Sequence, residues 1–195
     1  MGEKGEKTRR RIIQSARTLF GSTGFTKTSM DDIVRVAGVT KGNLYYYFSS
    51  KEELGSAVLD KTIAEEFGAE QIDGERDPVR EILAMFRRAE KKMAGGQCKG
   101  GCLFGNLALE VSDVHDQLRR KLDHAFSTWE MRVEGVLESG QRRGLLRATL
   151  QPKAAARFIV ATLEGGILLS KVKRDVRALK NCAEMVELVL EGFRA

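Results

Sequence analysis

Hydrogen-bonding side chains of several kinds are concentrated in residues 40–51, which read TKGNLYYYFSSK. Lys41 can neutralise a phosphate or donate to guanine acceptors, and Asn43 can read a base edge. Three consecutive tyrosines offer hydroxyls to phosphate oxygens, and Gly42 lets the backbone approach a groove closely. These residue types together predict contact with a nucleic-acid duplex.

Helical spacing divides this segment into an inner and an outer face. Leu44 and Phe48 are four residues apart and therefore point inward, whereas Gly42 and Tyr46 point outward. One inner face cannot bury three consecutive tyrosines, although the alternative remains that the tyrosines pack against a neighbouring domain. The next helix starts at residues 49–51, and its free N–H groups suit another phosphate.

The excess positive charge lies in the same part of the chain. Residues 1–51 contain ten Lys or Arg and four acidic residues, which accounts for the whole net charge of +6. The remaining residues contain 23 basic and 23 acidic side chains. A phosphate-binding surface explains this asymmetry, because neutralising phosphates releases condensed counterions. A solvated basic tail explains residues 9–11 but not the charges spread through a periodic segment.

The elements that position these residues are three short helices, expected at residues 7–22, 29–37 and 40–48. Ser29 and Thr40 are suitable N-caps, and Gly38 ends the second helix. A helix, a turn with glycine and a short second helix make the arrangement in which the second helix enters the DNA major groove.

The N-terminal segment resembles the TetR family of bacterial regulators over about its first 55 positions. The resemblance is carried by Thr8–Ile13, Ala16, Leu19–Phe20, Gly24–Phe25, Thr28–Met30, Ile33, Ala37–Val39, Thr40–Phe48 and Ser50–Leu54. Tyr47 departs from the pattern, since a histidine is common there. The resemblance implies an all-helical homodimer that binds a palindromic double-stranded DNA operator and is released by a small-molecule effector. The DNA contacts that it implies are Thr28, Ser29, Thr40, Lys41, Gly42, Tyr45, Tyr46, Tyr47 and Lys51.

The rest of the chain also reads as helix, so the predicted fold class is all-α. Further helices are expected at residues 50–70, 78–94, 102–111, 114–143, 152–173 and 175–193, with a loop at 71–77. A helix-turn-helix domain of residues 1–52 and a helical effector-binding and dimerisation domain of residues 53–195 follow from this pattern.

The last two helices carry stripes that suit a four-helix interface between two copies of the chain. The first stripe contains Ala154, Ala155, Phe158, Ile159, Ala161, Thr162, Gly165, Gly166 and Leu169. The second contains Ala183, Val186, Leu190 and Phe193. The alternative is that both stripes belong to the intramolecular core.

An effector pocket between helices needs aromatic walls and a few polar groups. The candidates are Phe86, Met93, Cys102, Phe104, Asn106, Phe126, Trp129, Phe158 and Glu164. Aromatics at helical spacing usually belong to the core. Asn106 and Glu164 are more informative, because a polar side chain on an apolar helix needs a partner.

The cysteines leave a second function open. Cys98 and Cys102 flank a glycine-rich loop, where they could form a reversible disulfide or react with an electrophile. The alternative is that Cys102 is a small buried residue at the start of a helix and Cys98 an incidental thiol in the loop. A site shared with His115 or His124 lacks the spacing of a zinc signature, so neither a metal nor another cofactor is expected.

Other classes of protein find little support in this sequence. An enzyme with a DNA-binding head would need catalytic motifs, and there is no Gly-rich phosphate loop, nucleophile elbow or paired metal motif. No apolar run approaches the length that spans a bilayer, and no apolar signal segment follows the N-terminus. The expected location is therefore the cytoplasm.

Overall fold

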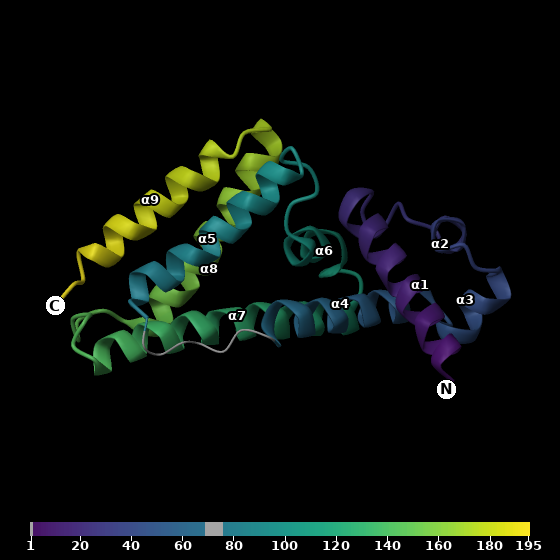
Figure 1. The fold of residues 1–195 in the computed structure, drawn as a ribbon, viewed down its shortest axis with the longest axis horizontal. Helices are drawn as coiled ribbons and strands as arrows, with labels where there is room; N and C mark the ends of the chain where they lie inside the picture. Colours follow the sequence, from purple (N-terminus) through teal and green to yellow (C-terminus); the bar gives the residue numbers. More distant parts are fainter. Residues whose placement is uncertain (1, 69–75) are drawn as a thin grey trace. The chain divides into compact units, whose positions relative to one another are not determined.

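A computed structural model of the protein describes residues 2–68 and 76–195, and these residues form nine α-helices (Figure 1). The helices are α1 (Glu3–Ser22), α2 (Met30–Ala37), α3 (Lys41–Tyr47), α4 (Lys51–Phe67), α5 (Pro78–Gly95), α6 (Leu103–Val111), α7 (Asp116–Arg142), α8 (Pro152–Lys173) and α9 (Arg177–Glu191). The all-α fold class is confirmed. Most of the predicted loop at 71–77 lies outside the described residues.

The helices form two compact units. Of the described residues, the first unit contains 2–68 and Leu103–Ala125, and the second contains 76–102 and Phe126–Ala195. The predicted boundary after residue 52 is therefore not where the contacts divide. Helices α4 and α6 and the beginning of α7 pack with the N-terminal helices, because α1 buries its apolar face against α4 and α6 as well as α2.

In the second unit, α5, α8, α9 and the later part of α7 enclose one core. Its buried side chains include Phe86, Leu137 and Leu163. Helices α8 and α9 lie side by side (Figure 1). Their close approach needs Gly166, because a Cβ there would lie 2.8 Å from the Leu179 side chain.

The predicted interface stripe on α9 is the core face of this helix, which corrects the sequence-based interpretation. Val186 and Leu190 are buried, and Ala183 and Phe193 pack against the same core. The exposed apolar side chains of α9 are instead Met185, Leu188 and Val189.

On α8 the predicted stripe divides between the core and the surface. Ile159 and Gly166 are buried. Phe158 and Leu169 are exposed, and they continue into a surface row with Leu168 and Val172. Helix α8 is therefore apolar on two sides, only one of which the described chain covers.

The C-terminus is fastened to the start of α5. Asp77 caps this helix by accepting the Arg80 N–H at 3.0 Å, and it also accepts hydrogen bonds from the Arg194 guanidinium. These hydrogen bonds, first those from Arg194, hold the pKa of Asp77 below its usual value despite partial burial. A β-bridge between Leu146 and Arg194 also joins the C-terminus to the segment that follows α7. No described helix is long and apolar enough to cross a membrane.

We expect Arg194→Ala to lower the free energy of unfolding by about 1–2 kcal/mol at neutral pH, since it removes a charged hydrogen-bonding partner of a half-buried carboxylate. The Asp77 pKa is lowered in the folded state. Its contribution is therefore present above the unfolded-state value and is lost as pH falls through the folded-state value. Urea unfolding of both proteins at a series of pH values measures the difference.

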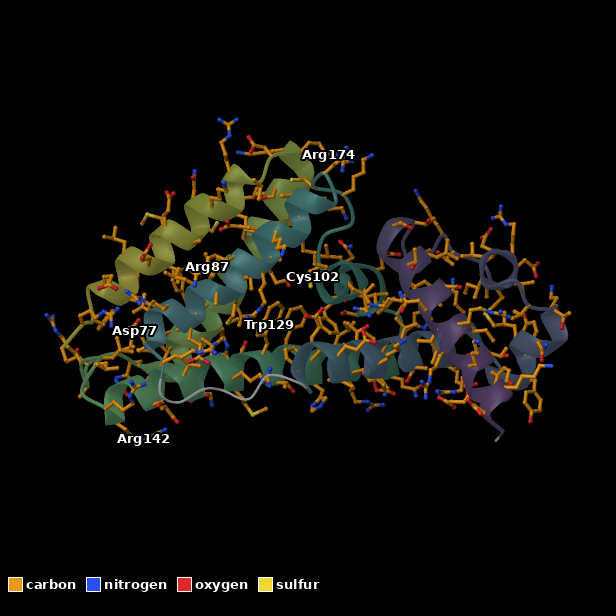
Figure 2. All side chains as sticks on the ribbon, in the orientation of Figure 1. Asp77, Arg87, Cys102, Trp129, Arg142 and Arg174 are labelled. Atoms are coloured by element: carbon orange, nitrogen blue, oxygen red, sulfur yellow. The ribbon has the colours of Figure 1, made fainter. Side chains whose placement is uncertain are left out.

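Arg142→Ala is the matched control, because Arg142 pairs with Glu138 at 3.7 Å in an exposed position at the end of α7 (Figure 2). Exposed pairs contribute little, so we expect a change below about 0.5 kcal/mol. Equal losses in the two variants, or an Arg194→Ala loss that persists unchanged in acid, would contradict the assignment.

Candidate DNA-binding surface and effector site

Three hydroxyl side chains set the starts of the helices that make up the N-terminal motif. Ser29 accepts the Asp32 N–H at 3.1 Å while the Asp32 carboxylate accepts the Ser29 N–H, a reciprocal capping box. Thr40 accepts the Asn43 N–H at 3.2 Å, and Ser50 accepts the Glu53 N–H at 3.1 Å. These bonds satisfy donors that short helices leave free. Local sequence therefore determines where each helix begins.

Two carboxylates in these helix starts are held in the charged state. The hydroxyl and the N–H of Ser29, with the Arg35 guanidinium, lower the pKa of Asp32. The hydroxyl and N–H of Ser49 lower the pKa of Glu53 in the same way. Negative charge in the first turn of a helix also suits the helix dipole.

Two side chains on one side of α3 fix the short helix to the rest of the unit. Leu44 and Phe48 are fully buried, as their spacing predicts. The Arg9 guanidinium lies 5.3 Å from the centre of the Phe48 ring, and the Arg11 guanidinium donates to the Gly38 carbonyl at 3.4 Å. Helix α1 therefore holds both α2 and α3 in place.

The opposite side of α3 is open to solvent. Tyr46 is 75% exposed and Tyr45 is 45% exposed, while the half-buried Tyr47 ring packs edge-on against Tyr46 at 5.0 Å. A Cβ added at Gly42 would meet nothing within 4 Å. Tyr45 and Tyr46 therefore do not pack into the rest of their unit.

Lys41 is exposed but already paired within the unit. Its ammonium lies 2.9 Å from the Asp31 carboxylate of α2, and both side chains are mostly exposed. The hydrogen bond and the charge of Asp31 raise the pKa of Lys41, so the lysine is fully charged at neutral pH.

Of the ten predicted DNA contacts, seven are exposed: Ser29, Thr40, Lys41, Gly42, Asn43, Tyr45 and Tyr46. Thr28 is instead buried, and its hydroxyl donates to the Gly24 carbonyl at 2.6 Å. Lys51 is half-buried, and its ammonium donates to the Phe25 carbonyl at 3.0 Å and the Thr28 carbonyl at 3.2 Å. The polar atoms of Thr28 and Lys51 therefore already form hydrogen bonds that stabilise the unit itself.

The predicted effector residues separate between the two units. Phe104 and Asn106 belong to the first, where the Phe104 ring stacks on Phe67 at 6.2 Å. Phe86 and Met93 are core side chains of the second, and Phe126 and Trp129 pack against that core. Phe158 is exposed on α8.

The side chains of Glu164 and Cys102 contact one another in the second unit. Cys102 and Trp129 of this unit are labelled in Figure 2. Burial raises the pKa of the Glu164 carboxyl, and a hydrogen bond with the Cys102 thiol and the charge of Lys92 oppose that rise. The Oε1 atom of Glu164 is buried without a hydrogen-bond partner among the described residues.

The loop before Cys102 has an unusual backbone. Gln97 and Cys98 both have positive φ, near 53° and 55°, and Cys98 is buried. The Arg174 guanidinium donates to the Cys98 carbonyl at 3.2 Å. All three cysteines are free, and no group of three metal-ligating side chains occurs among the described residues.

A groove of about 240 Å³ between α5 and α9 contains none of the predicted effector residues. Its walls carry mainly charged side chains: Arg87, Glu90, Lys180, Glu184 and Glu187, with Leu83 and Ala183. This lining differs from the mostly apolar walls of typical small-molecule sites.

Comparison with known proteins settles the family. Residues 12–58 match the family model for bacterial regulatory proteins of the tetR family. Residues 78–186, more than half of the chain, match the model for the tetracyclin repressor-like C-terminal domain. The chain belongs to the TetR family. This membership confirms the recognition made from the N-terminal motif and the prediction of a ligand-responsive transcriptional repressor.

Several curated relatives of this TetR-family protein are transcriptional regulators. It is 29% identical over 170 residues to the repressor DhaR of Mycobacterium sp. strain GP1, covering 86% of this chain and 84% of that one. It is 31% identical over 153 residues to the regulator AcuR of Cereibacter sphaeroides, covering 77% of this chain and 70% of that one.

Solved structures of the family have the same fold. A TetR regulator from Chloroflexus aurantiacus superposes with a TM-score of 0.87 at 26% identity, covering 99% of this chain and 98% of that one. The reduced form of Escherichia coli NemR superposes with a TM-score of 0.82 at 26% identity, covering 96% of this chain and 97% of that one.

Proposed function

We propose that this TetR-family repressor reads its operator through the exposed side of α3 and forms a dimer through the exposed apolar rows of α8 and α9. An effector bound in the second unit releases the DNA. The observation that carries the proposal is the pairing of a buried anchor, Leu44 and Phe48, with an exposed side that presents Lys41, Gly42 and Tyr46. A buried inner side and a polar outer side are what a recognition helix in a major groove requires.

Selection of duplexes from a randomised pool tests this function directly. A homodimer with one reading head on each protomer should select an inverted repeat, because operator symmetry mirrors protein symmetry. Enrichment of no sequence, or of a single unrepeated site, would contradict the proposal.

Lys41 is the cation that we assign to a phosphate or to guanine. Asp31 competes for its ammonium in the free protein, so binding to DNA exchanges one anion for another. The exchange requires little energy, because exposed ion pairs contribute little. Thr40, Asn43 and the tyrosines supply neutral donors around it. Ser29 is exposed, but its hydroxyl already donates to Asp32 at 2.6 Å. The other predicted contacts, Thr28 and Lys51, stabilise the turn before α2.

Lys41→Ala is expected to weaken operator binding and to reduce the slope of log affinity against log salt by about one unit, the loss of one phosphate contact. Asp31→Asn should instead raise affinity, by about twofold to threefold, because it frees the lysine. Fluorescence anisotropy at several salt concentrations measures both. Identical slopes for Lys41→Ala and the wild-type protein would reject the assignment.

The dimer interface that we propose uses the surface rows rather than the predicted core stripe of α9. On α8 the row runs through Phe158, Leu168, Leu169 and Val172 at helical spacing, and Gly165 within it leaves open space. On α9, Met185, Leu188 and Val189 are exposed. A monomer seldom leaves so extended an apolar surface in water, and two copies of such helix pairs make a four-helix interface.

Leu169→Asp should convert the dimer to monomers at micromolar concentration, because it places a charge in an apolar interface. Operator affinity should then fall by about tenfold or more, since two linked heads bind more tightly than one. Analytical ultracentrifugation measures the state. Met131→Asp is the control, because Met131 is 58% exposed on α7 outside these rows and should leave the dimer intact. A dimeric Leu169→Asp protein would contradict the interface.

The effector site that we propose lies beside Glu164 and Cys102 in the second unit, with Trp129 and Phe126 nearby in the same core. The unpaired Oε1 atom of Glu164 offers an acceptor for a ligand donor, because a buried polar group without a partner carries a desolvation cost. Phe86 and Met93 are buried in the same core. Phe104, Asn106 and Phe158 remain predictions without such support.

A cysteine-based sensor is the second candidate, and one observation favours it. Cys102 is partly exposed, whereas Cys98 is buried, so of these two thiols a reagent reaches Cys102 first. Its thiol contacts the Glu164 carboxyl, which can accept the proton. An enzymatic role has no comparable support, because the matched relatives are named as regulators.

Cys102→Ser separates the two candidates. If the effector binds reversibly, treatment with hydrogen peroxide or iodoacetamide should leave operator binding of the wild-type and Cys102→Ser proteins alike. Gel-shift titration before and after treatment measures this. The outcome that would favour the sensor is that treatment releases the wild-type and Cys98→Ser proteins from the operator but not the Cys102→Ser protein. The reversible-effector hypothesis would then give way to thiol chemistry at Cys102.

A further inference from the structure

The segment that joins α1 to α2 is held by a side chain from outside the helix-turn-helix. The Thr26 N–H donates to the Glu110 carboxylate of α6 at 2.8 Å. Gly24 has a φ of +97°, and a Cβ there would lie 2.7 Å from the other oxygen of Glu110. Glycine at this position therefore allows both the turn and the close approach of the carboxylate.

Helix α4 holds the same segment from a second direction. The Lys51 ammonium donates to the Phe25 carbonyl at 3.0 Å and the Thr28 carbonyl at 3.2 Å, and it lies 4.6 Å from the centre of the Phe25 ring. The Thr28 hydroxyl closes the turn on the Gly24 carbonyl. A cation thus binds the carbonyls of this segment, and an anion binds its N–H.

The Phe25 ring fastens the middle of the segment. It is buried, with its centre 5.0 Å from that of Phe20 and 5.9 Å from that of His115, which lies edge-on before α7. Gly55 of α4 accommodates the ring, because a Cβ there would lie 2.9 Å from it. The buried ring therefore anchors the segment, and Ser29 caps α2 at the end of it.

We propose that Glu110 is a positioning residue for DNA binding: through the Thr26 N–H it fixes the entry to α2, and therefore the orientation of α3. The proposal rests on the proposed DNA-binding function. Helix α6 begins at Leu103, directly after Cys102 of the candidate effector site. A shift of α6 relative to this segment would stretch or break the Glu110 contact.

The contact lies at the surface of its unit, which separates positioning from general stability. Thr26 is exposed, Glu110 is half-buried, and the ring contacts of Phe25 involve neither side chain. Loss of the carboxylate should therefore widen the range of positions of the segment while the fold remains. A charged hydrogen bond to a backbone N–H is strong enough to restrict that range.

Glu110→Ala should lower operator affinity by about tenfold while the slope against salt stays unchanged, because no phosphate contact is lost. Hydrogen exchange at the Thr26 amide should become faster, and the melting temperature should change by less than about 3 °C. Glu110→Gln keeps an oxygen acceptor and should stay within about threefold of the wild-type affinity.

Asp113→Asn is the matched control, because it removes one exposed negative charge from the turn after α6 without touching the segment. Its affinity should equal or slightly exceed that of the wild type. The proposal is overturned if Glu110→Ala binds the selected duplex as the wild type does, or if Glu110→Gln and Glu110→Ala lose affinity equally. Failure of the wild-type protein to bind any duplex would instead overturn the proposed function. That result is distinguishable from the two above, because both of them require that the wild-type protein binds the selected duplex.

Discussion

Burial of Leu44 and Phe48 is the constraint on which the DNA-binding surface depends. Helix α3 has seven residues, and a helix this short is not stable alone in water. Two buried side chains on one side, with Thr40 as its cap, hold the helix and leave the other side free. The same anchorage that makes the helix stable thus decides which residues it presents.

Residues from three other helices, at increasing distance along the chain, stabilise the position of α3. Arg9 and Arg11 of α1 contact Phe48 and the turn before α3. Lys51 of α4 and Glu110 of α6 hold the segment that enters α2. Polar side chains make these outer contacts, and the buried Phe25 ring packs the same segment from within.

Local signals explain what could be predicted from the sequence. Ser29, Thr40 and Ser50 cap helices through residues three positions ahead, and α8 has the predicted bounds because Pro152 starts it. Contacts between distant residues left no such signal. Glu110 and Thr26 are 84 residues apart, and Arg194 and Asp77 are 117 apart. Helix α9 has apolar side chains on two sides, so periodicity alone could not decide that Val186 faces the core and Met185 the solvent. The sequence singles out Glu164 as an effector candidate because a carboxyl on an apolar helix needs a partner, and this assignment stays a prediction.

Amide hydrogen exchange of the wild-type protein, with and without a selected operator duplex, tests most directly whether α3 is the reading surface. The account predicts that DNA slows exchange most strongly within residues 40–51 and leaves α9 unchanged, because a bound duplex covers the exposed side of a helix that is otherwise only marginally stable. Protection confined to the second unit, with residues 40–51 exchanging as in the free protein, would contradict it.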